Sequence, residues 1–209
     1  MKDWKKLWKK VWHFIWEDNS IWSWIVNIVL AFVLIKFIVY PGLGLILSTS
    51  HPVVAVVSES MEHNGNFDNW WDKAGTWYTN NGINKEKFAG FPLKNGFNKG
   101  DIMVLRGKKA GDIETGDVIV FWSAKKDPII HRVVKKWQEK SIYYFQTKGD
   151  HNPNSIIQKD NQGNIILDET RISQEQIVGN AVLRIPLLGY IKIVFVEIFN
   201  LFKGFLQNG

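Results

Sequence analysis

An unbroken apolar segment near the N-terminus constrains this chain more than any other feature of its sequence. Residues 21–40 read IWSWIVNIVLAFVLIKFIVY, and Ser23, Asn27 and Lys36 are the only clearly polar members. A helix of this length spans about 30 Å, which matches the hydrocarbon thickness of a bilayer. The apolar stretch is longer than that of a secretory signal, and no small-residue cleavage site follows it. We therefore expect a retained transmembrane anchor over residues 20–41 rather than a buried core helix.

The charges on either side of the anchor predict its orientation. Five lysines precede it, whereas residues 41–72 contain neither Lys nor Arg. Because positively charged flanks stay in the cytoplasm, we expect a cytoplasmic N-terminus in the cell membrane and an extracytoplasmic domain after the anchor. In residues 1–19, tryptophan and aliphatic residues recur at helical spacing opposite the lysines, which is typical of a basic amphipathic helix on an anionic leaflet.

The composition excludes several kinds of chemistry. The 209 residues contain no cysteine, so thiol catalysis, cysteine-ligated zinc and disulfides are excluded. The net charge of +6 is concentrated beside the anchor, with no nucleic-acid-binding motif around it, so we expect the lipid bilayer as a partner and no nucleic acid. His131, Asp150 and His151 are candidate ligands for a metal hydrolase, but no pair of ligands at helical spacing accompanies them. We expect neither a metal nor a cofactor.

The rest of the chain changes to a strand-like pattern. Short β-rich runs, separated by clusters of Gly and Asn, lie at residues 53–57, 102–105, 117–121, 129–134, 142–146 and 177–183. No helical pattern of about ten residues lies between them, so we predict a mainly β fold, a small antiparallel barrel or sandwich over residues 48–189.

Two further segments differ from this pattern. Residues 62–99 are rich in Trp, Asn and Gly, and we interpret them as an insertion that docks on the membrane, shapes a cleft or packs on its own domain. Residues 190–209 predict an amphipathic C-terminal helix associated with the membrane, with a second membrane span as the alternative.

Three residues are candidates for catalysis. Ser60 ends the β-branched run VVAVVSESM, His131 lies inside the strand-like PIIHRVV, and Asp150 lies in the turn-like TKGDHNP. A serine nucleophile needs a base within hydrogen-bond reach, and a carboxylate beside the base fixes its tautomer and stabilises the imidazolium. Each residue also has a structural interpretation: a histidine that packs within a strand, and an aspartate that caps a turn.

The ordered blocks SESM, GDIMVLRG, GDVIVFW, IIHRVV, TKGDHNP and QIVGNAVLRIPLLGYI, behind a transmembrane segment, resemble the type I signal peptidases. The resemblance is to the archaeal and endoplasmic-reticulum-type branch, which has a histidine base, and it covers roughly residues 53–191. It implies that Ser60 is the nucleophile and His131 its general base. It also implies that the Ser60 backbone N–H and the Ser58 hydroxyl donate to the oxyanion.

The acidic part of the site departs from the family pattern. Asp150 matches the first acidic position, whereas Ile156 occupies the place where family members have a second aspartate. An insertion rich in Asn, Gln and Gly separates the two halves of this region. Asp168 is the best candidate for the displaced carboxylate, and Asp160 is the second.

The resemblance implies a membrane-bound serine endopeptidase that removes signal peptides from translocated preproteins. Signal-peptide-bearing preproteins are then its substrates, and the protein translocation machinery is a candidate partner. The alternative is a membrane-tethered binding module that uses the Trp-rich insertion, with Ser60 and His131 inert.

Overall fold

The computed structural model describes residues 2–188 and divides the chain into two compact units, Met1–Ile46 and Leu47–Gly209. The helix expected at residues 190–209 lies outside the described residues.

The first unit is helical. It contains α1 (Lys2–Trp16), and then a continuous helical segment made of α2 (Ile21–Leu34), the π-helical turn η1 (Ile35–Val39) and α3 (Tyr40–Leu47). This segment of 27 residues has a mean hydropathy of 2.3, and it is the one helix among residues 2–188 that is long and apolar enough to cross a membrane. The apolar N-terminal helix expected from the sequence is confirmed, and it extends to Leu47.

Pro41 explains the π-helical turn. Proline has no backbone N–H, so Pro41 cannot donate to a carbonyl one turn earlier. Just before it, the Tyr40 N–H bonds to the carbonyl of Ile35, five residues back, which is the spacing of a π-helix. The helix therefore continues through the proline with a local change in its hydrogen-bond ladder.

Two of the polar residues in the apolar segment have partners at the end of α1. The Ser23 hydroxyl donates to the carbonyl of Phe14, and the Asn27 amide donates to that of Ile15 at 2.8 Å. The last carbonyls of a helix have no partner within the helix. Ser23 and Asn27 thus satisfy the end of α1 as well as their own polar groups.

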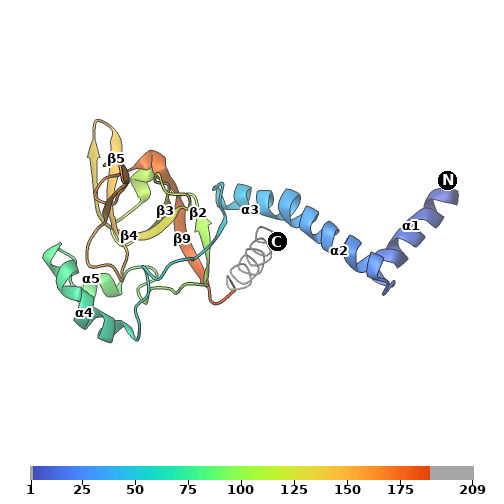
Figure 1. The fold of residues 1–209 in the computed structure, drawn as a ribbon, viewed down its shortest axis with the longest axis horizontal. Helices are drawn as coiled ribbons and strands as arrows, with labels where there is room; N and C mark the ends of the chain where they lie inside the picture. Colours follow the sequence, from blue (N-terminus) through green and yellow to red (C-terminus); the bar gives the residue numbers. More distant parts are fainter. Residues whose placement is uncertain (1, 189–209) are drawn as a thin grey trace. The chain divides into compact units, whose positions relative to one another are not determined.

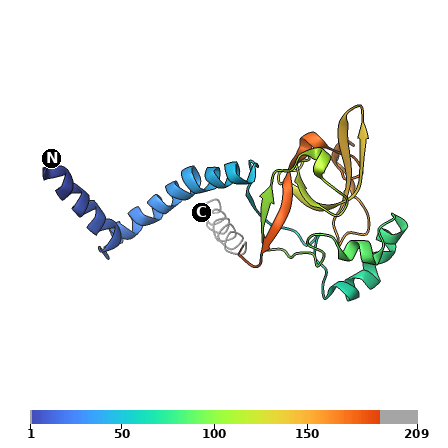
Figure 2. The same ribbon diagram turned by 180° about the vertical axis from the view of Figure 1, so that it is seen from behind.

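The second unit is built on an antiparallel sheet, curled into a half-barrel (Figures 1 and 2). Its strand order is β1-β2-β9-β3-β4-β5-β8, and β6 and β7 form a separate hairpin. The bounds are β1 (Val53–Ala55), β2 (Ile102–Arg106), β3 (Val118–Phe121), β4 (Ile129–Glu139), β5 (Ile142–Lys148), β6 (Ile157–Lys159), β7 (Ile165–Asp168), β8 (Ile172–Ser173) and β9 (Ile177–Ile185), with 3-10 turns at η2 (Ala110–Asp112) and η3 (Gln174–Gln176). The mainly β, antiparallel fold expected from the sequence is confirmed.

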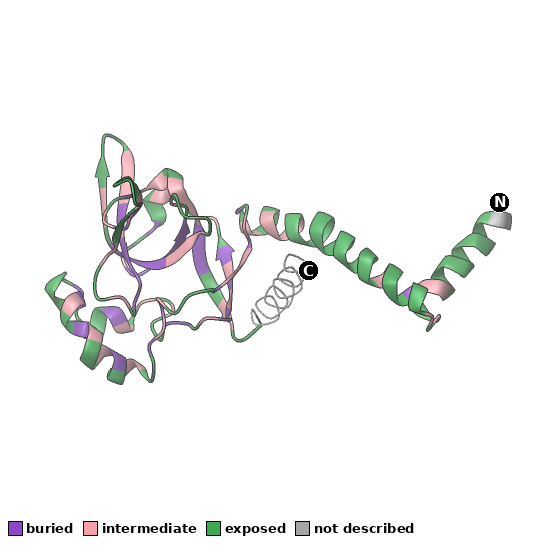
Figure 3. Ribbon diagram, viewed as in Figure 1, coloured by how far each residue is buried: buried purple, intermediate pink, exposed green. Residues whose placement is uncertain are grey.

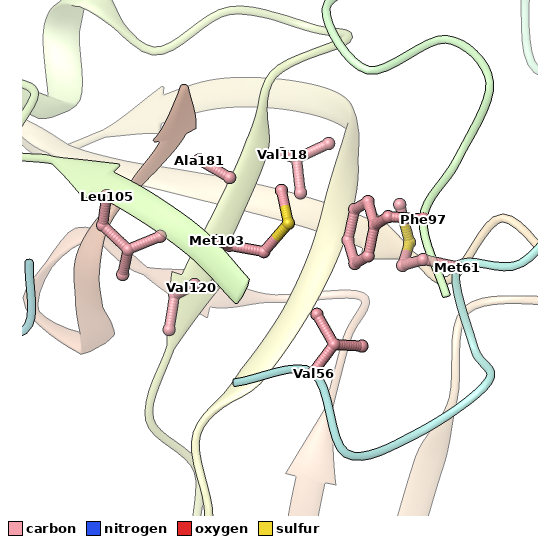
Figure 4. Packing of buried hydrophobic residues seen from close by; sticks show 8 residues of the cluster. All are labelled: Val56, Met61, Phe97, Met103, Leu105, Val118, Val120 and Ala181. Atoms are coloured by element: carbon pink, nitrogen blue, oxygen red, sulfur yellow. The ribbon is translucent and has the colours of Figure 1, made fainter. Parts of the chain in front are cut away.

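The central strand β3 is buried on both faces, and its alternating side chains enter two different core clusters. Val118 and Val120 belong to the first cluster, drawn in Figure 4, which is made of Val56, Met61, Phe97, Met103, Leu105, Val118, Val120 and Ala181. Ile119 and Phe121 point to the second, with Ile113, Val133, Phe145, Leu167 and Ile172. Buried residues concentrate in the sheet, whereas the segment from α2 to α3 is exposed along nearly its whole length (Figure 3).

The insertion of residues 62–99 contains two helices that the sequence analysis did not predict, α4 (Phe67–Asn80) and α5 (Lys85–Ala89). The Asn66 side chain caps α4 by accepting from the Asn69 N–H, and Asn84 caps α5 in the same way. Their buried side chains Trp70, Tyr78 and Phe88 form a third cluster with Ile83, which lies between the two helices, and this cluster packs on Val134 of β4. The insertion therefore packs on its own domain.

We expect Leu105→Ala to destabilise the second unit by about 2–5 kcal/mol, because Leu105 is fully buried in the first core cluster and alanine leaves a cavity. The measurement is thermal unfolding of the full chain in detergent, followed by tryptophan fluorescence. Ile165→Ala is the matched control, because Ile165 is 56% exposed. An equal loss of stability in both variants would contradict this account of the core.

Candidate active site

Ser60 lies in the turn that follows β1, next to a residue of the first core cluster. Met61 is buried in that cluster, and its carbonyl accepts the Phe97 N–H. The carbonyl of Ser60 accepts the His151 N–H at 2.9 Å. The turn is thus fixed on one side by the core and on the other by the segment that follows β5.

The structure brings His131 to Ser60. His131 Nε2 lies 2.9 Å from the Ser60 Oγ, although the two residues are 71 positions apart in the sequence. His131 is on β4, paired with Ile119 of β3, and only 5% of its surface is exposed. A buried ring on a strand that is paired with its neighbour has little freedom to turn, so this contact is pre-organised.

The other ring nitrogen of His131 contacts a buried carboxylate, that of Glu169. Nδ1 forms a short hydrogen bond with Glu169 Oε1, which also accepts the Thr147 hydroxyl at 3.0 Å. The second oxygen, Oε2, accepts the Ile156 N–H at 2.8 Å. Both oxygens therefore have partners, and a carboxylate on Nδ1 places the acceptor nitrogen of a neutral ring at Nε2, toward Ser60.

The position of this carboxylate differs from the sequence expectation. The carboxylate of Asp168 accepts from the N–H and hydroxyl of Thr170, and Asp160 caps the turn between β6 and β7 through Gln162 and Asn164. Neither contacts His131. The residue that sequence reasoning missed, Glu169, is the neighbour of the favoured candidate.

The β6–β7 hairpin explains how Glu169 reaches the ring. Ile157 pairs with Asp168, so the next pair along the ladder joins Ile156 and Glu169, and the Glu169 N–H donates to the Ile156 carbonyl at 2.9 Å. Glu169 therefore lies beside the position where the family pattern has its second aspartate. The turn sequence KDNQGNI is the signal in the sequence that could have identified Glu169, because a hairpin centred on this turn pairs Ile156 with Glu169.

Asp150 is fully buried and faces away from His131, toward Arg132. Arg132 Nη2 donates to Asp150 Oδ2 at 2.7 Å, and Arg132 Nε donates to Oδ1 at 2.9 Å. Two side chains of the insertion also bond to this carboxylate, the Tyr78 hydroxyl at 2.8 Å and His63 Nε2 at 2.9 Å. Asp150 thus joins β4, the insertion and the turn after β5.

These contacts shift two pKa values. Burial alone would raise the pKa of the Asp150 carboxyl, but the charge of Arg132 and the hydrogen bonds from His63 and Arg132 hold it well below its usual range. Burial, reinforced by the charge of Asp150, raises the pKa of the Tyr78 hydroxyl well above its usual value. Asp150 is therefore an anion, and Tyr78 a neutral donor, at neutral pH.

Gly149 lies where no side chain fits. A Cβ atom there would lie 2.7 Å from the Ser60 carbonyl oxygen and 2.9 Å from His131 Nε2. The backbone of this turn therefore packs directly against both residues. Because Asp150 is the next residue, its contacts with Arg132 hold the wall of the site in place.

Lys148 is the other basic side chain near the site. Burial lowers the pKa of Lys148 to about 8, against the opposing influence of Asp150 and Glu169. Its Nζ donates to the carbonyl of Gly149 at 3.1 Å and lies 3.5 Å from the Tyr78 hydroxyl. These contacts turn the amine toward the insertion, so the base in contact with Ser60 is His131.

Ser58 lies beside the candidate nucleophile. Its Oγ is 3.1 Å from the Ser60 Oγ, and the residue is exposed. A hydroxyl, an imidazole and a carboxylate in hydrogen-bonded order form the catalytic triad of many serine hydrolases. The fold and the site together thus have the features of a serine hydrolase whose chain carries an apolar helix able to span a membrane.

The similarity to known proteins is more specific. The chain is 26% identical over 163 residues, 77% of this chain and 73% of the relative, to the signal peptidase complex catalytic subunit SEC11 of Fusarium vanettenii. It is 27% identical over 167 residues to that of Komagataella phaffii, covering 77% of this chain and 76% of the relative. To that of Pyrenophora teres f. teres it is 33% identical over 103 residues, 48% of this chain and 57% of the relative.

No family model matches the chain. The named relatives nevertheless confirm the resemblance drawn from the motifs, because all three are catalytic subunits of signal peptidase complexes. They also confirm the expectation that it is an enzyme, a hydrolase of the signal peptidase class.

We expect Asp150→Asn to lower the free energy of unfolding by roughly 3 kcal/mol or more, because it leaves Arg132 buried without its counter-charge. The pKa of Asp150 in the folded state lies below its value of about 3.9 in the unfolded chain. The stabilisation that the Asp150 carboxylate gives the fold is therefore fully present above about pH 5 and declines as the pH falls below that. The difference in melting temperature between wild type and variant should accordingly be constant from pH 5 to 8 and shrink toward pH 3.

The matched control is Asp127→Asn in the exposed loop between β3 and β4, which should unfold like the wild type at every pH. A difference for Asp150→Asn that grows on acidification would show that this carboxyl is not held as an anion in the fold.

Proposed function

We propose that this chain is a membrane-anchored serine endopeptidase that removes signal peptides from translocated preproteins, with Ser60 as nucleophile. The observation that carries the proposal is the 2.9 Å contact between the Ser60 Oγ and His131 Nε2. The naming of its relatives as signal peptidase catalytic subunits supports the choice of substrate.

In this mechanism His131 takes the proton of Ser60 as the Oγ attacks the scissile carbonyl. Glu169, bonded to Nδ1, stabilises the imidazolium that forms. His131 then gives the proton to the leaving amine, and a water molecule, activated by the same ring, hydrolyses the acyl-enzyme. The hydrogen bonds from Thr147 and Ile156 hold the Glu169 carboxylate in place against the ring.

The negative charge on the tetrahedral intermediate requires donors close to Ser60. We assign this role to the Ser60 backbone N–H and the Ser58 hydroxyl, whose Oγ lies 3.1 Å from the nucleophile. Pre-placed donors of this kind contribute on the order of 10²–10³ to the rate in serine hydrolases. Ser58 is exposed, so its hydroxyl is available to an incoming carbonyl.

The apolar helix supports a reaction at a membrane. We propose that Ile21–Leu47 spans the bilayer with the N-terminus in the cytoplasm, as the lysines before it favour. A preprotein held in the same bilayer by its signal sequence then meets the enzyme at a high effective concentration. The translocation machinery that delivers such substrates is the expected neighbour.

The alternative, a binding module that uses the Trp-rich insertion, has less support. The insertion commits its aromatic residues to a cluster on β4, and two of its side chains, His63 and Tyr78, bond to Asp150. It supports the turn at Gly149 instead of presenting a separate aromatic surface.

We expect Ser60→Ala to abolish cleavage of a preprotein by the detergent-solubilised full chain, because it removes the attacking oxygen. Ser58→Ala should lower kcat on the order of 10²-fold, and Ser123→Ala, in the loop after β3, should cleave at the wild-type rate. Product formation is followed by gel shift and mass spectrometry of the new N-terminus. Unchanged cleavage by Ser60→Ala would refute the nucleophile, and a wild-type protein that binds the preprotein without cutting it would favour the binding module.

The pair Glu169→Gln and Asp168→Asn tests the carboxylate. We expect Glu169→Gln to lower kcat by roughly 10³–10⁴-fold with little change in KM, because the imidazolium loses its counter-charge. Asp168→Asn, one residue away, should stay within about threefold of the wild type, because its carboxylate bonds to Thr170 and, within residues 2–188, to no other residue. A larger loss for Asp168→Asn would return the role to Asp168, provided that both variants melt at the wild-type temperature.

A further inference from the structure

A basic segment, here called the basic loop, begins at the last residue of β2 on the second unit. It reads Arg106-Gly107-Lys108-Lys109, and the three cationic residues are exposed. Lys108 Nζ lies 2.6 Å from Asp117 Oδ2, so its charge is already paired. Arg106 and Lys109 form no ion pair with any other residue in the described range 2–188.

This loop is bonded to the chain at the point where the apolar helix ends. The Gly107 N–H donates to the carbonyl of Leu47, the last residue of α3, at 2.7 Å. A Cβ atom on Gly107 would lie 1.9 Å from the carbonyl oxygen of Ser48, so only glycine permits this approach. The basic loop is therefore bonded to Leu47, the C-terminal residue of the apolar helix.

The length of the helix determines how deep in the bilayer its C-terminal end lies. The segment Ile21–Leu47 has 27 residues and is about 40 Å long, which equals the bilayer thickness including both headgroup regions. When such a helix spans the bilayer, its ends lie at the level of the lipid headgroups. Leu45 and Ile46 are 83% and 79% exposed, as residues in contact with lipid would be. Leu47, and the loop bonded to it, then lie among the phosphates of the outer leaflet.

A cavity of about 400 Å³ opens beside the loop. Arg106, Lys108 and Lys109 line it together with one carboxylate, Asp112, so positive charge predominates. Asn180 of β9 forms part of the wall. It is only 8% exposed, and its Oδ1 has no hydrogen-bond partner within the described part of the chain. The cavity thus offers cations for a phosphate and an acceptor for a hydroxyl group.

We propose that this cavity binds the headgroup of an anionic phospholipid of the outer leaflet, with Arg106 and Lys109 on the phosphate. A hydroxyl-bearing headgroup, such as that of phosphatidylglycerol, also supplies a donor for Asn180. The site fixes the depth of the second unit at the membrane surface. The proposal rests on the membrane anchoring of the chain and is independent of its peptidase activity.

The test uses the full chain in phosphatidylcholine nanodiscs that contain a phosphatidylglycerol with a photoactivatable headgroup. After irradiation, lipid adducts are mapped by mass spectrometry to peptides that cover residues 102–117. We expect Arg106→Gln/Lys109→Gln to lower this labelling by roughly thirtyfold, about fivefold for each cation near a membrane surface. Adducts on α1, whose lysines are unchanged in every variant, provide the internal reference.

Lys135→Gln/Lys140→Gln is the charge-matched control, because both lysines are exposed on the β4–β5 hairpin, and it should label like the wild type. Equal labelling in the Arg106/Lys109 variant, or equal labelling by a phosphatidylcholine probe, would overturn the proposal. Loss of labelling in excess inorganic phosphate would also overturn it, in favour of a site for free phosphate. If the double variant melts early, Lys109→Gln alone should still lower the labelling about fivefold.

Discussion

The buried ion pair between Arg132 and Asp150 is the interaction on which the rest of the site depends. Adjacent residues on a strand point to opposite faces, so His131 faces Ser60 while Arg132 faces the insertion. Through Asp150 the pair fixes the turn at Gly149, which packs on both the imidazole and the Ser60 carbonyl. Charges this deeply buried are costly to separate. The Arg132–Asp150 pair therefore links the stability of the fold to the geometry of the contact between the Ser60 hydroxyl and His131.

Much of the fold follows from local patterns in the sequence. The apolar helix and all six predicted β-rich runs formed, because hydrophobic periodicity and turn residues act over short distances. The candidate nucleophile and base were also found from their motifs, and the structure places Ser60 and His131 in contact. That contact joins residues far apart in the sequence, so only the order of the motifs, and not their periodicity, could indicate it.

Other features depend on tertiary packing, and local sequence patterns do not predict them. Helix α4 contains Asn, Thr and Gly, which are poor helix formers, and it is stabilised by burying Trp70 and Tyr78 against β4. Asp150 is one of the carboxylates that the sequence offers, and it bonds to Arg132, the residue after the histidine, on the opposite face of the strand. Glu169 is not among the sequence candidates, because an aspartate stands beside it and the segment before it is interpreted only as an insertion rich in Asn, Gln and Gly.

The β6–β7 hairpin has a consequence for tracing descent among such enzymes. Its ladder, and not the count of residues, sets Glu169 opposite Ile156. Lengthening or shortening the hairpin by whole pairs would leave that juxtaposition intact. The carboxylate that partners the histidine can thus shift by about a dozen positions in a sequence alignment and still occupy the same place in space. An alignment alone would then record a missing acidic residue, although the structure has an equivalent one.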